Sequence, residues 1–406
     1  MTVMRLTSIL LLLAAAPACA KAQNLQWHGY LDYRLVAGSS APNWTDGGLG
    51  KLRWDGHGVS ARFGGAALLA TAQLSPELLG VASAQFQTSD RRGIDLTEAW
   101  LRYRPVSTTP WRWSLRGGLF FPAVSLENDG IGWTSPYTLT PSAINSWVGE
   151  ELRSTGAEFR LERRGRSMSV EAAVTAFVGN DPAGEQLAAR GWSLSDLVYG
   201  LGSSMREPDL AARDGPPPRR YDAFVETDHR IGWQGELTVR ADDVSRLTLL
   251  HYDNRADPTT STMFEGQRIF SWHTRFWSLG ERTRMGDWVL IGQAIRGSTA
   301  IVPSPFFHTE TGFWSAFAMV AREQGRWRPA LRLEMFGTRQ RPDSLAERAN
   351  EHGRALTAAL NWQPRSWLRV TGELIALDSS RTERRHLGLA ESSFDLQAQL
   401  GARLVF

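Results

Sequence analysis

The chain ends in thirteen residues that alternate between apolar and other side chains, Phe394-Asp395-Leu396-Gln397-Ala398-Gln399-Leu400-Gly401-Ala402-Arg403-Leu404-Val405-Phe406. One face carries Phe394, Leu396, Ala398, Leu400, Ala402, Leu404 and Phe406, and the other carries Asp395, Gln397, Gln399 and Arg403. A period of two predicts a β-strand with one apolar and one wet side. An apolar strand left unpaired at the edge of a sheet promotes aggregation in a soluble protein. In a closed barrel the strand is paired on both sides and its apolar face meets lipid. The stretch therefore favours a transmembrane β-barrel.

The start of the chain has the features of a secretory signal peptide. Arg5 precedes an apolar run at 9–16, and Ala20-Lys21-Ala22 supplies a small-residue cleavage site. The run is shorter than the roughly 20 residues that cross a bilayer as a helix. We expect residues 1–22 to be the signal peptide and 23–406 to be the barrel domain.

The composition agrees with an exported barrel and does not suggest a nucleic-acid partner. The net charge is +3, and it falls to +1 once Arg5 and Lys21 are removed with the signal. The single cysteine, Cys19, lies in the predicted signal, so we expect no disulfide in the mature chain. A lipid anchor on Cys19 is the weaker alternative. Many of the 17 tryptophans lie near predicted strand ends, as in the aromatic girdles of membrane barrels, although a soluble β-protein with core tryptophans remains an alternative.

Alternation along the mature chain predicts sixteen antiparallel strands, with an error of a few residues at each end. They are Leu25–Ala37, His57–Leu74, Leu78–Thr88, Ile94–Pro105, Trp111–Phe121, Leu152–Glu162, Ser167–Val178, His229–Ala241, Arg246–Asn254, Arg268–Glu281, Asp287–Ser298, Glu310–Ala321, Trp327–Gly337, Arg354–Gln363, Trp367–Leu377 and Ser393–Phe406. A bend is expected in the second strand at Gly64-Gly65.

The connections between these strands alternate in length. Tight turns fall at 75–77, 107–110, 163–166, 242–245, 283–286, 322–326 and 364–366. The connections between them are longer, at 38–56, 122–151, 179–228, 255–267, 299–309, 338–353 and 378–392, with one short exception at 89–93. Short periplasmic turns and long outer loops on an even number of strands are typical of an outer-membrane barrel, with both chain ends on the periplasmic side.

On this architecture, the signal peptide and the terminal Phe406, the mature chain resembles the bacterial outer-membrane porins, particularly the sixteen-stranded kind and the phosphate-selective-porin-like group. The resemblance implies an up-and-down barrel in the outer membrane of a Gram-negative bacterium, surrounded by outer-membrane lipid. It implies a water-filled channel for passive diffusion of small hydrophilic solutes or ions, with no cofactor, no metal and no enzymatic activity. It also implies a homotrimer and recognition of Phe406 by the outer-membrane assembly machinery. Independently, sixteen strands leave an interior wide enough for an aqueous channel.

In porins the third outer loop folds into the barrel and narrows the pore, and the corresponding loop here is 122–151. It carries Glu127, Asp129, Glu150 and Glu151 and no basic residue. Opposite it, the polar faces of the strands supply arginines, expected to be Arg34, Arg102, Arg104, Arg112, Arg116, Arg275, Arg328, Arg332 and Arg369. We expect the four acids to face Arg102, Arg112, Arg116 and Arg332 across the constriction. Rings of fixed charge select ions, and arginines favour anions, but the sign of selectivity stays open. The alternative is that these groups pair with one another as a satisfied network.

In two of the predicted strands the sequence itself indicates which side faces lipid and which side faces the lumen. Trp111, Trp113 and Leu115 alternate with Arg112 and Arg116. A charge on the lipid side at mid-membrane costs about 2–4 kcal/mol, so these arginines are expected in the lumen. The strand from Trp327 repeats the pattern, with Trp327, Leu331, Leu333 and Met335 opposite Arg328, Arg332 and Glu334.

Two other functions stay open. A barrel enzyme of lipase or deacylase type needs a Ser/His/Asp set near the outer rim, for which His251 with Asp253 is the most suggestive pair. No Gly-x-Ser-x-Gly elbow accompanies it. A plugged or adhesive barrel would use the long loop 179–228, in which 186–190 and 195–199 have short helical patterns.

Overall fold

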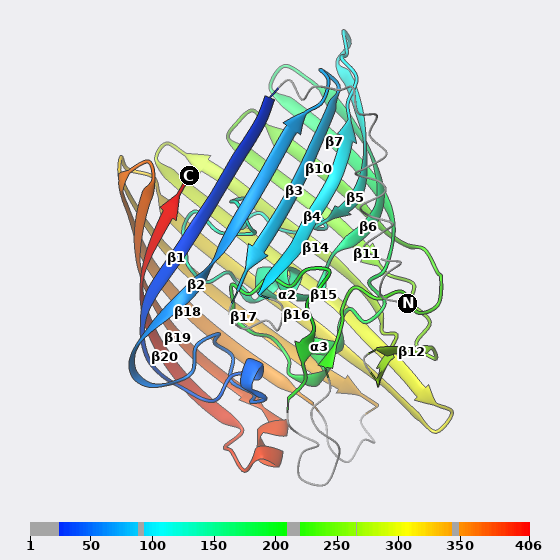
Figure 1. Ribbon diagram of the computed structural model, residues 1–406, viewed down its shortest axis with the longest axis vertical. Coiled ribbons are helices and arrows are strands. Elements are labelled where there is room, and N and C mark those ends of the chain that lie inside the picture. The colour runs from blue at the N-terminus through cyan, green and yellow to red at the C-terminus, as the bar shows by residue number, and fades with distance from the viewer. Residues whose placement is uncertain (1–23, 88–92, 209–219, 265, 343–348) are drawn as a thin grey trace.

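The computed structural model describes residues 24–87, 93–208, 220–264, 266–342 and 349–406. Sixteen antiparallel strands form one closed barrel, in which successive barrel strands pair and the last pairs with the first (Figure 1). These strands are β1 (Asn24–Ser40), β2 (Gly56–Gln73), β3 (Leu78–Phe86), β4 (Ile94–Tyr103), β5 (Trp111–Phe120), β6 (Ser154–Arg164), β7 (Met168–Val178), β10 (Gly232–Ala241), β11 (Ser245–Asp253), β14 (His273–Met285), β15 (Trp288–Ser304), β16 (Phe307–Arg322), β17 (Trp327–Arg341), β18 (Glu351–Arg365), β19 (Leu368–Arg381) and β20 (Ser392–Val405).

The predicted fold is confirmed, since each of the sixteen predicted strands corresponds to one barrel strand. Two small hairpins stand outside the barrel sheet, β8 (Met205–Arg206) with β9 (Arg220–Tyr221) and β12 (Ser261–Phe264) with β13 (Gln267–Phe270). The long connection predicted at 299–309 is wrong. Strand β15 continues to Ser304 and β16 begins at Phe307, so this hairpin extends beyond the expected strand ends. The predicted signal peptide, 1–22, lies outside the described residues.

We call one end of the barrel the turn end. It carries the short turns, and β1 begins and β20 ends there. The opposite end is the loop end. Phe406 closes the sheet at the turn end. Its backbone exchanges two hydrogen bonds with Gly29, of 2.9 and 3.1 Å. A Cβ on Gly29 would lie 2.7 Å from the carbonyl oxygen of Ala67 and 2.5 Å from the Phe406 ring, so the close approach to the neighbouring backbone requires glycine at this position.

The expected bend in β2 is a β-bulge. Asp32 pairs with Gly65 and Tyr33 with Phe63, so Gly64 is the extra residue. A Cβ on Gly64 would lie 2.9 Å from the Asp32 carboxyl carbon. The bulge therefore leaves room inside the barrel for the side chains of β1.

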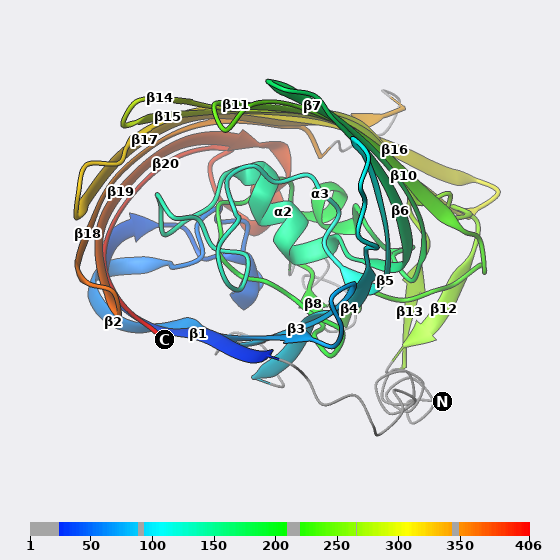
Figure 2. The ribbon, with the colours of Figure 1, turned by 90° about the horizontal axis from the view of Figure 1, so that it is seen from above.

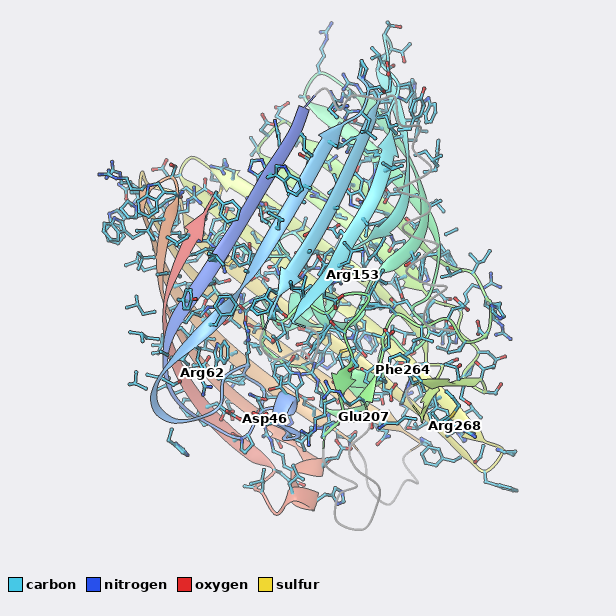
Figure 3. The ribbon with its side chains drawn as sticks, viewed as in Figure 1. Asp46, Arg62, Arg153, Glu207, Phe264 and Arg268 are labelled. Carbon is cyan, nitrogen blue, oxygen red and sulfur yellow. The ribbon has the colours of Figure 1, made fainter. Side chains whose placement is uncertain are left out.

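The outer wall is apolar along the middle of the strands. In β5, Trp111, Trp113 and Leu115 are 50%, 42% and 48% exposed, whereas Ser114 on the opposite face is buried. Figure 3 shows the side chains of this wall together with those of the interior. At the turn end, Trp327 and Trp362 stack with ring centroids 5.8 Å apart, as in an aromatic girdle.

The faces predicted for the strands that begin at Trp111 and Trp327 are confirmed. The face predicted for Arg275 is wrong. This residue is exposed on the outer face of β14 beside Trp277, while Phe276 is buried inside. Because both faces of this strand mix aromatic with polar or charged side chains, hydrophobicity alone could not distinguish them.

Segments from the loop end fold back into the barrel and fill much of its interior (Figure 2). They include α2 (Ala143–Glu151), α3 (Glu185–Ala189) and the 3-10 turn η1 (Trp44–Asp46), while η3 (Thr382–Leu387) lies at the loop end. The segment 186–190 nearly coincides with α3, but 195–199 is not helical, so that prediction is wrong. In the part of the chain that the structure describes, no helix is long and apolar enough to cross a bilayer.

The lipid-facing assignment of the outer wall predicts a depth-dependent cost for a charge. Leu279→Arg places a cation on the outer face of β14, six positions or about 15 Å of barrel height from Met285 at the turn end. We expect Leu279→Arg to lower the free energy of unfolding in lipid vesicles by about 2–4 kcal/mol and Met285→Arg by about 0–1 kcal/mol. Reversible urea unfolding measures both, and equal costs would contradict the assignment.

Candidate pore and constriction

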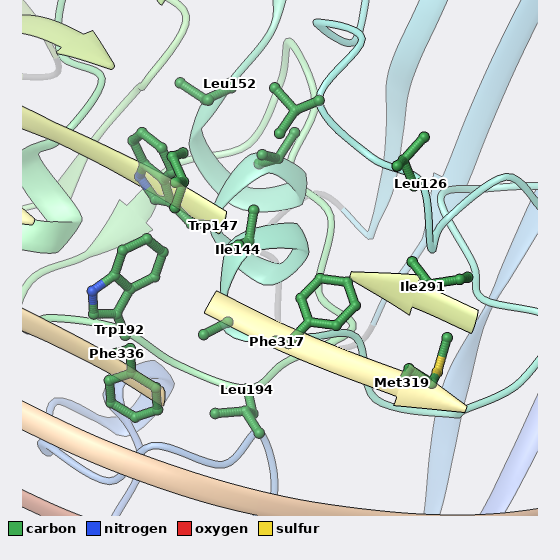
Figure 4. Close-up of a cluster of buried hydrophobic side chains, with 14 of the residues drawn as sticks. Leu126, Ile144, Trp147, Leu152, Trp192, Leu194, Ile291, Phe317, Met319 and Phe336 are labelled. Atoms are coloured by element: carbon green, nitrogen blue, oxygen red, sulfur yellow. The ribbon is translucent and has the colours of Figure 1, made fainter. Parts of the chain in front are cut away.

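The central feature of the lumen is the seat of helix α2 on the inner wall of β14–β17. Trp147 packs edge-on against Phe276 and Phe313, with ring centroids 5.4 and 5.2 Å away. The surrounding cluster includes Ile144 and Trp192 from the loops and further side chains of the wall (Figure 4). The aromatic and aliphatic side chains on the inner faces of β14–β16 therefore form an apolar seat for one side of the helix.

The N-terminus of α2 is held by carboxylates. The amide of Ser142 donates to Glu127 (3.0 Å), and the amide of Ala143 donates to Glu334 on β17 (2.8 Å). Arg332 lies between the two acids, 2.5 Å from Glu127 and 3.0 Å from Glu334. All three charged side chains are fully buried. Negative charge at a helix N-terminus is favourable, and the arginine balances it.

The segment before α2 is fixed to the next strands of the wall. Glu373 on β19 accepts the amides of Leu139 (2.7 Å) and Thr140 (3.1 Å). Asn361 on β18 donates to the carbonyl of Tyr137 (2.5 Å). Loop 122–151 is thus tied to β17, β18 and β19 mainly through its own backbone.

The C-terminal acids of α2 bind the fourth outer loop, 179–228. Glu150 forms a buried ion pair with Arg190. Glu151 accepts from Tyr221 (2.7 Å), from the amide of Gln186 (3.0 Å) and from the Trp147 indole (2.5 Å). Burial raises the pKa of Glu150 to about 7, although Arg190 opposes the shift, and burial also raises the pKa of Glu151.

Arg153 caps the other end of the helix (labelled in Figure 3). Its guanidinium donates to the carbonyls of Val148 (3.1 Å), Gly149 (3.1 Å) and Tyr199 (2.8 Å). A cation at a helix C-terminus satisfies the free carbonyls and the dipole. This contact also joins the helix to loop 179–228.

Beyond α2, residues 195–200 reach the opposite wall. The amide of Ser195 donates to Ser146 on the helix (2.9 Å). Asp196 pairs with Arg34 on β1 (2.6 Å), and the amide of Gly200 donates to Asp95 on β4 (3.0 Å). The loops therefore bridge the lumen from β16 and β17 to β1 and β4.

The first outer loop contributes a second buried ionic group nearer the loop end. Lys51 pairs with Glu351 on β18 (2.8 Å) and donates to the carbonyl of Arg190 (2.6 Å). Glu351 also pairs with Arg381 on β19 (3.2 Å). Three outer loops thus share the lumen and hold one another in place.

The structure brings together one pair from the eight residues predicted at the constriction, Glu127 with Arg332. Glu150 and Glu151 face loop 179–228, while Asp129 is half exposed and pairs with Arg282 (2.6 Å). Arg116 pairs with Glu158 on β6 (2.7 Å), and Arg102 and Arg112 lie on the lumen faces of β4 and β5 towards the turn end.

Sequence reasoning missed the carboxylates of Glu334, Glu373 and Glu158 as partners. Each is an acid on the inner face of a strand, with an apolar residue on one side or both. That pattern marks a lumen acid but does not reveal which loop amide or arginine it meets.

The turn-end half of the lumen has a different character, since arginines outnumber carboxylates there. The arginines are Arg102, Arg112, Arg116, Arg160, Arg164, Arg240, Arg246, Arg282, Arg284, Arg328 and Arg369. The acids with which some of them pair are Asp129, Glu158, Glu162, Glu171, Glu236 and Glu323. Within the described residues, Arg102, Arg112, Arg246 and Arg328 have no carboxylate at ion-pair distance.

Several of these arginines are direct cross-strand neighbours. Arg102 pairs in register with Arg116, and Arg246 lies between Arg240 and Arg282. A cavity of about 260 Å³ at the turn end is lined by Arg240, Arg246, Arg282 and Arg284, and also by the turn residues Asp242 and Asp243. Like charges directly opposite one another are unfavourable, so the arginines raise the positive potential of this layer, and the two aspartates offset part of it at the turn.

A compact acidic group anchors loop 179–228 near the loop end. Oxygen atoms of Asp181, Glu226 and Asp228 lie within 4.8 Å of one another. Asp181 accepts from the amide (2.5 Å) and hydroxyl (2.8 Å) of Thr227. Burial, followed by repulsion from Glu226 and Asp228, raises the pKa of Asp181 to about 7.

Comparison with known proteins gives a match of fold. No family model matches the chain, and no curated protein matches it. The outer membrane channel DcaP of Acinetobacter baumannii is 10% identical, with 94% of this chain and 97% of that chain covered and a TM-score of 0.55. A loop L8 deletion mutant of OmpT, an outer membrane protein of Vibrio cholerae, is 10% identical over 95% of this chain and 100% of that chain, with a TM-score of 0.53. OmpF of Salmonella typhi in complex with daunomycin is 11% identical over 95% and 98%, with a TM-score of 0.50. At these identities the likeness establishes the transmembrane sixteen-stranded barrel fold alone.

Removing Arg332 should release loop 122–151. Arg332→Met leaves Glu127 and Glu334 buried without their cation, and breaking a buried pair from one side costs about 3–5 kcal/mol. We expect protease cleavage within 122–151 of the folded barrel. The triple variant Arg332→Met, Glu127→Gln, Glu334→Gln removes the unpaired charges and should restore most of the protection. Equal resistance of wild type and Arg332→Met would contradict the anchor.

The acidic group predicts a loop that loosens as pH rises. Because the pKa of Asp181 is raised, its stabilising contribution is fully present below the ordinary value near 4 and is lost as pH rises through about 7. Hydrogen exchange of 220–228, corrected for intrinsic rates, should be faster at pH 8.5 than at pH 5, and Asp181→Asn should reduce the difference. Peptides from β11 serve as the internal control. If the exchange rates of 220–228 differed between the two pH values by the same factor in Asp181→Asn as in wild type, titration of Asp181 would not be the cause.

Proposed function

We propose that the protein is an outer-membrane channel of the porin type, through which small hydrophilic solutes or ions diffuse passively. In this proposal 1–22 is the export signal, the loop end faces the outside and the turn end faces the periplasm. A closed barrel of sixteen strands with an apolar outer wall and a wide interior supports it. Transport of this kind needs no cofactor and no catalytic group.

The observation that carries the selectivity is the excess of arginine in the turn-end lumen. Arg102, Arg112, Arg246 and Arg328 face the lumen without a carboxylate partner in the described chain. Fixed cations in a low-dielectric passage attract anions and exclude cations. We therefore propose a preference for anions, and the acids of loop 122–151 do not oppose it because Glu127, Glu150 and Glu151 are already engaged.

The conducting section is expected to be narrow. Loops from three outer connections contact β1, β4 and β16–β19, so they occupy most directions across the lumen. In this proposal loop 122–151 forms the constriction, with the Glu127–Arg332 pair as its anchor rather than as its selectivity filter.

A second candidate is a plugged barrel that binds a ligand at its loop end. The apolar cluster around Trp147 and Trp192 favours it, because a packed core inside the barrel resembles a plug. The enzyme alternative receives less support. His251 lies on the outer face of β11, 4.4 Å between ring centroids from Trp277, and Asp253 pairs with His273 instead.

We further propose, from the resemblance to porins, a homotrimer in outer-membrane lipid and recognition of Phe406 by the assembly machinery. Cross-linking in native membranes tests the oligomer. The yield of folded barrel after deletion of Phe406 tests the recognition.

Single-channel recording under a KCl gradient tests whether the barrel conducts and whether it prefers anions or cations. We expect small stable openings and a reversal potential that reports chloride preference. The variant Arg102→Gln, Arg112→Gln, Arg246→Gln should lower the chloride-to-potassium permeability ratio several-fold, whereas Arg275→Gln on the outer wall should leave it unchanged. A silent but folded barrel would favour the plugged candidate, and a cation preference would contradict the proposed selectivity.

A further inference from the structure

The outer wall has a depression on the side formed by β16 to β20. Its volume is about 690 Å³. Small side chains, Ala316, Ala318 and Ala376, form its floor, and larger apolar side chains stand around it, namely Trp314, Leu333, Met335, Leu356 and Phe394. Because these side chains project from the lipid-facing side of the strands, the depression is a groove in the wall and not part of the lumen.

A charged pair closes the groove towards the loop end. Arg354 on β18 and Asp378 on β19 are cross-strand partners, and both line the groove. The Asp378 carboxylate accepts from Nε of Arg354 (3.1 Å) and lies at ion-pair distance from its Nη2 (3.0 Å). No acceptor for Nη1 exists among the residues that the structure describes, and the Arg354 side chain is 75% exposed.

The position of Arg354 along the strand fits a membrane boundary. Trp362 marks the aromatic girdle at the turn end of the same strand. Eight residues of tilted strand separate it from Arg354, which corresponds to about 20 Å of height in an apolar band of about 25 Å. The guanidinium therefore lies where acyl chains give way to headgroups.

Further basic side chains share this border. Arg341 is exposed at the loop end of β17, and His352 is exposed on the outer face of β18. Glu310 on β16 and Asp378 on β19 are outward acids on neighbouring strands. Among the residues that the structure describes, Arg354, Arg341 and His352 therefore place basic groups at the loop-end border of the apolar groove.

We propose that this groove binds an anionic lipid of the surrounding leaflet, with one acyl chain on the alanine floor and the phosphate on the free edge of Arg354. A guanidinium offers paired N–H donors to a phosphate, and a concave apolar surface receives a flexible chain without leaving a void. Asp378 orients the arginine and leaves Nη1 for the ligand. The inference goes beyond channel activity and requires only that the barrel lies in a membrane.

Native mass spectrometry of the full barrel tests the lipid site. The probes are dioleoyl phosphatidylglycerol and dioleoyl phosphatidylcholine, which have the same acyl chains but differ in net charge. We expect wild type to retain phosphatidylglycerol several-fold better than phosphatidylcholine. Arg354→Gln should abolish this preference, and Ala318→Phe should lower retention of phosphatidylglycerol by filling the groove.

Arg275→Gln is the matched control, since Arg275 is also an exposed outer-wall arginine near the loop end but lies outside the groove. Equal loss in Arg275→Gln and Arg354→Gln would overturn the site in favour of general surface charge. Retention that survives both groove variants would also overturn it. So would an oligomer that dissociates on Ala318→Phe, because the groove would then hold a second copy of the chain. Heat-modifiable migration in gels verifies that each variant is folded. Conductance of Arg354→Gln equal to that of wild type shows that a loss of lipid retention does not come from a failure of the channel proposal.

Discussion

Closure of the sheet between β1 and β20 sets the constraint that governs the whole molecule. Sixteen strands enclose an interior too wide for barrel side chains to fill, and the outer wall must stay apolar all round. The interior must therefore hold either water or segments of the chain itself. This protein uses three of its outer loops, and the inner faces of the strands have adapted to receive them.

Two kinds of inner wall result. Where α2 rests, the inner faces of β14–β16 carry aromatic and aliphatic side chains between small polar ones, and the former form the apolar seat of the helix. On β17 and β19, single acids instead bind backbone amides of the loop, as Glu334 and Glu373 do. A loop backbone inside a barrel has many amides to satisfy, and wall carboxylates supply acceptors without requiring regular structure in the loop.

The sequence was sufficient to predict the sixteen strands because alternation and turn residues are local signals. It was insufficient wherever the decisive contact lies across the lumen. Arg275 shows the limit, since aromatic and polar residues occur on both faces of its strand and the outward face was predicted wrongly. Glu127 and Arg332 were each recognised as lumen charges. Their pairing, however, depends on how loop 122–151 rests on β17, and the engagement of Glu150 by Arg190 depends on how two loops fold against each other.

The distribution of charge follows from the same packing. In the loop-filled half, acids and arginines are buried together, and a buried charge without a partner is too costly to keep. In the turn-end half, arginines such as Arg112 and Arg246 remain without carboxylates at ion-pair distance in the described chain. The packing of the loops thus accounts for the acids that are engaged inside the barrel, and the proposed anion preference depends on the arginines that are left without a carboxylate.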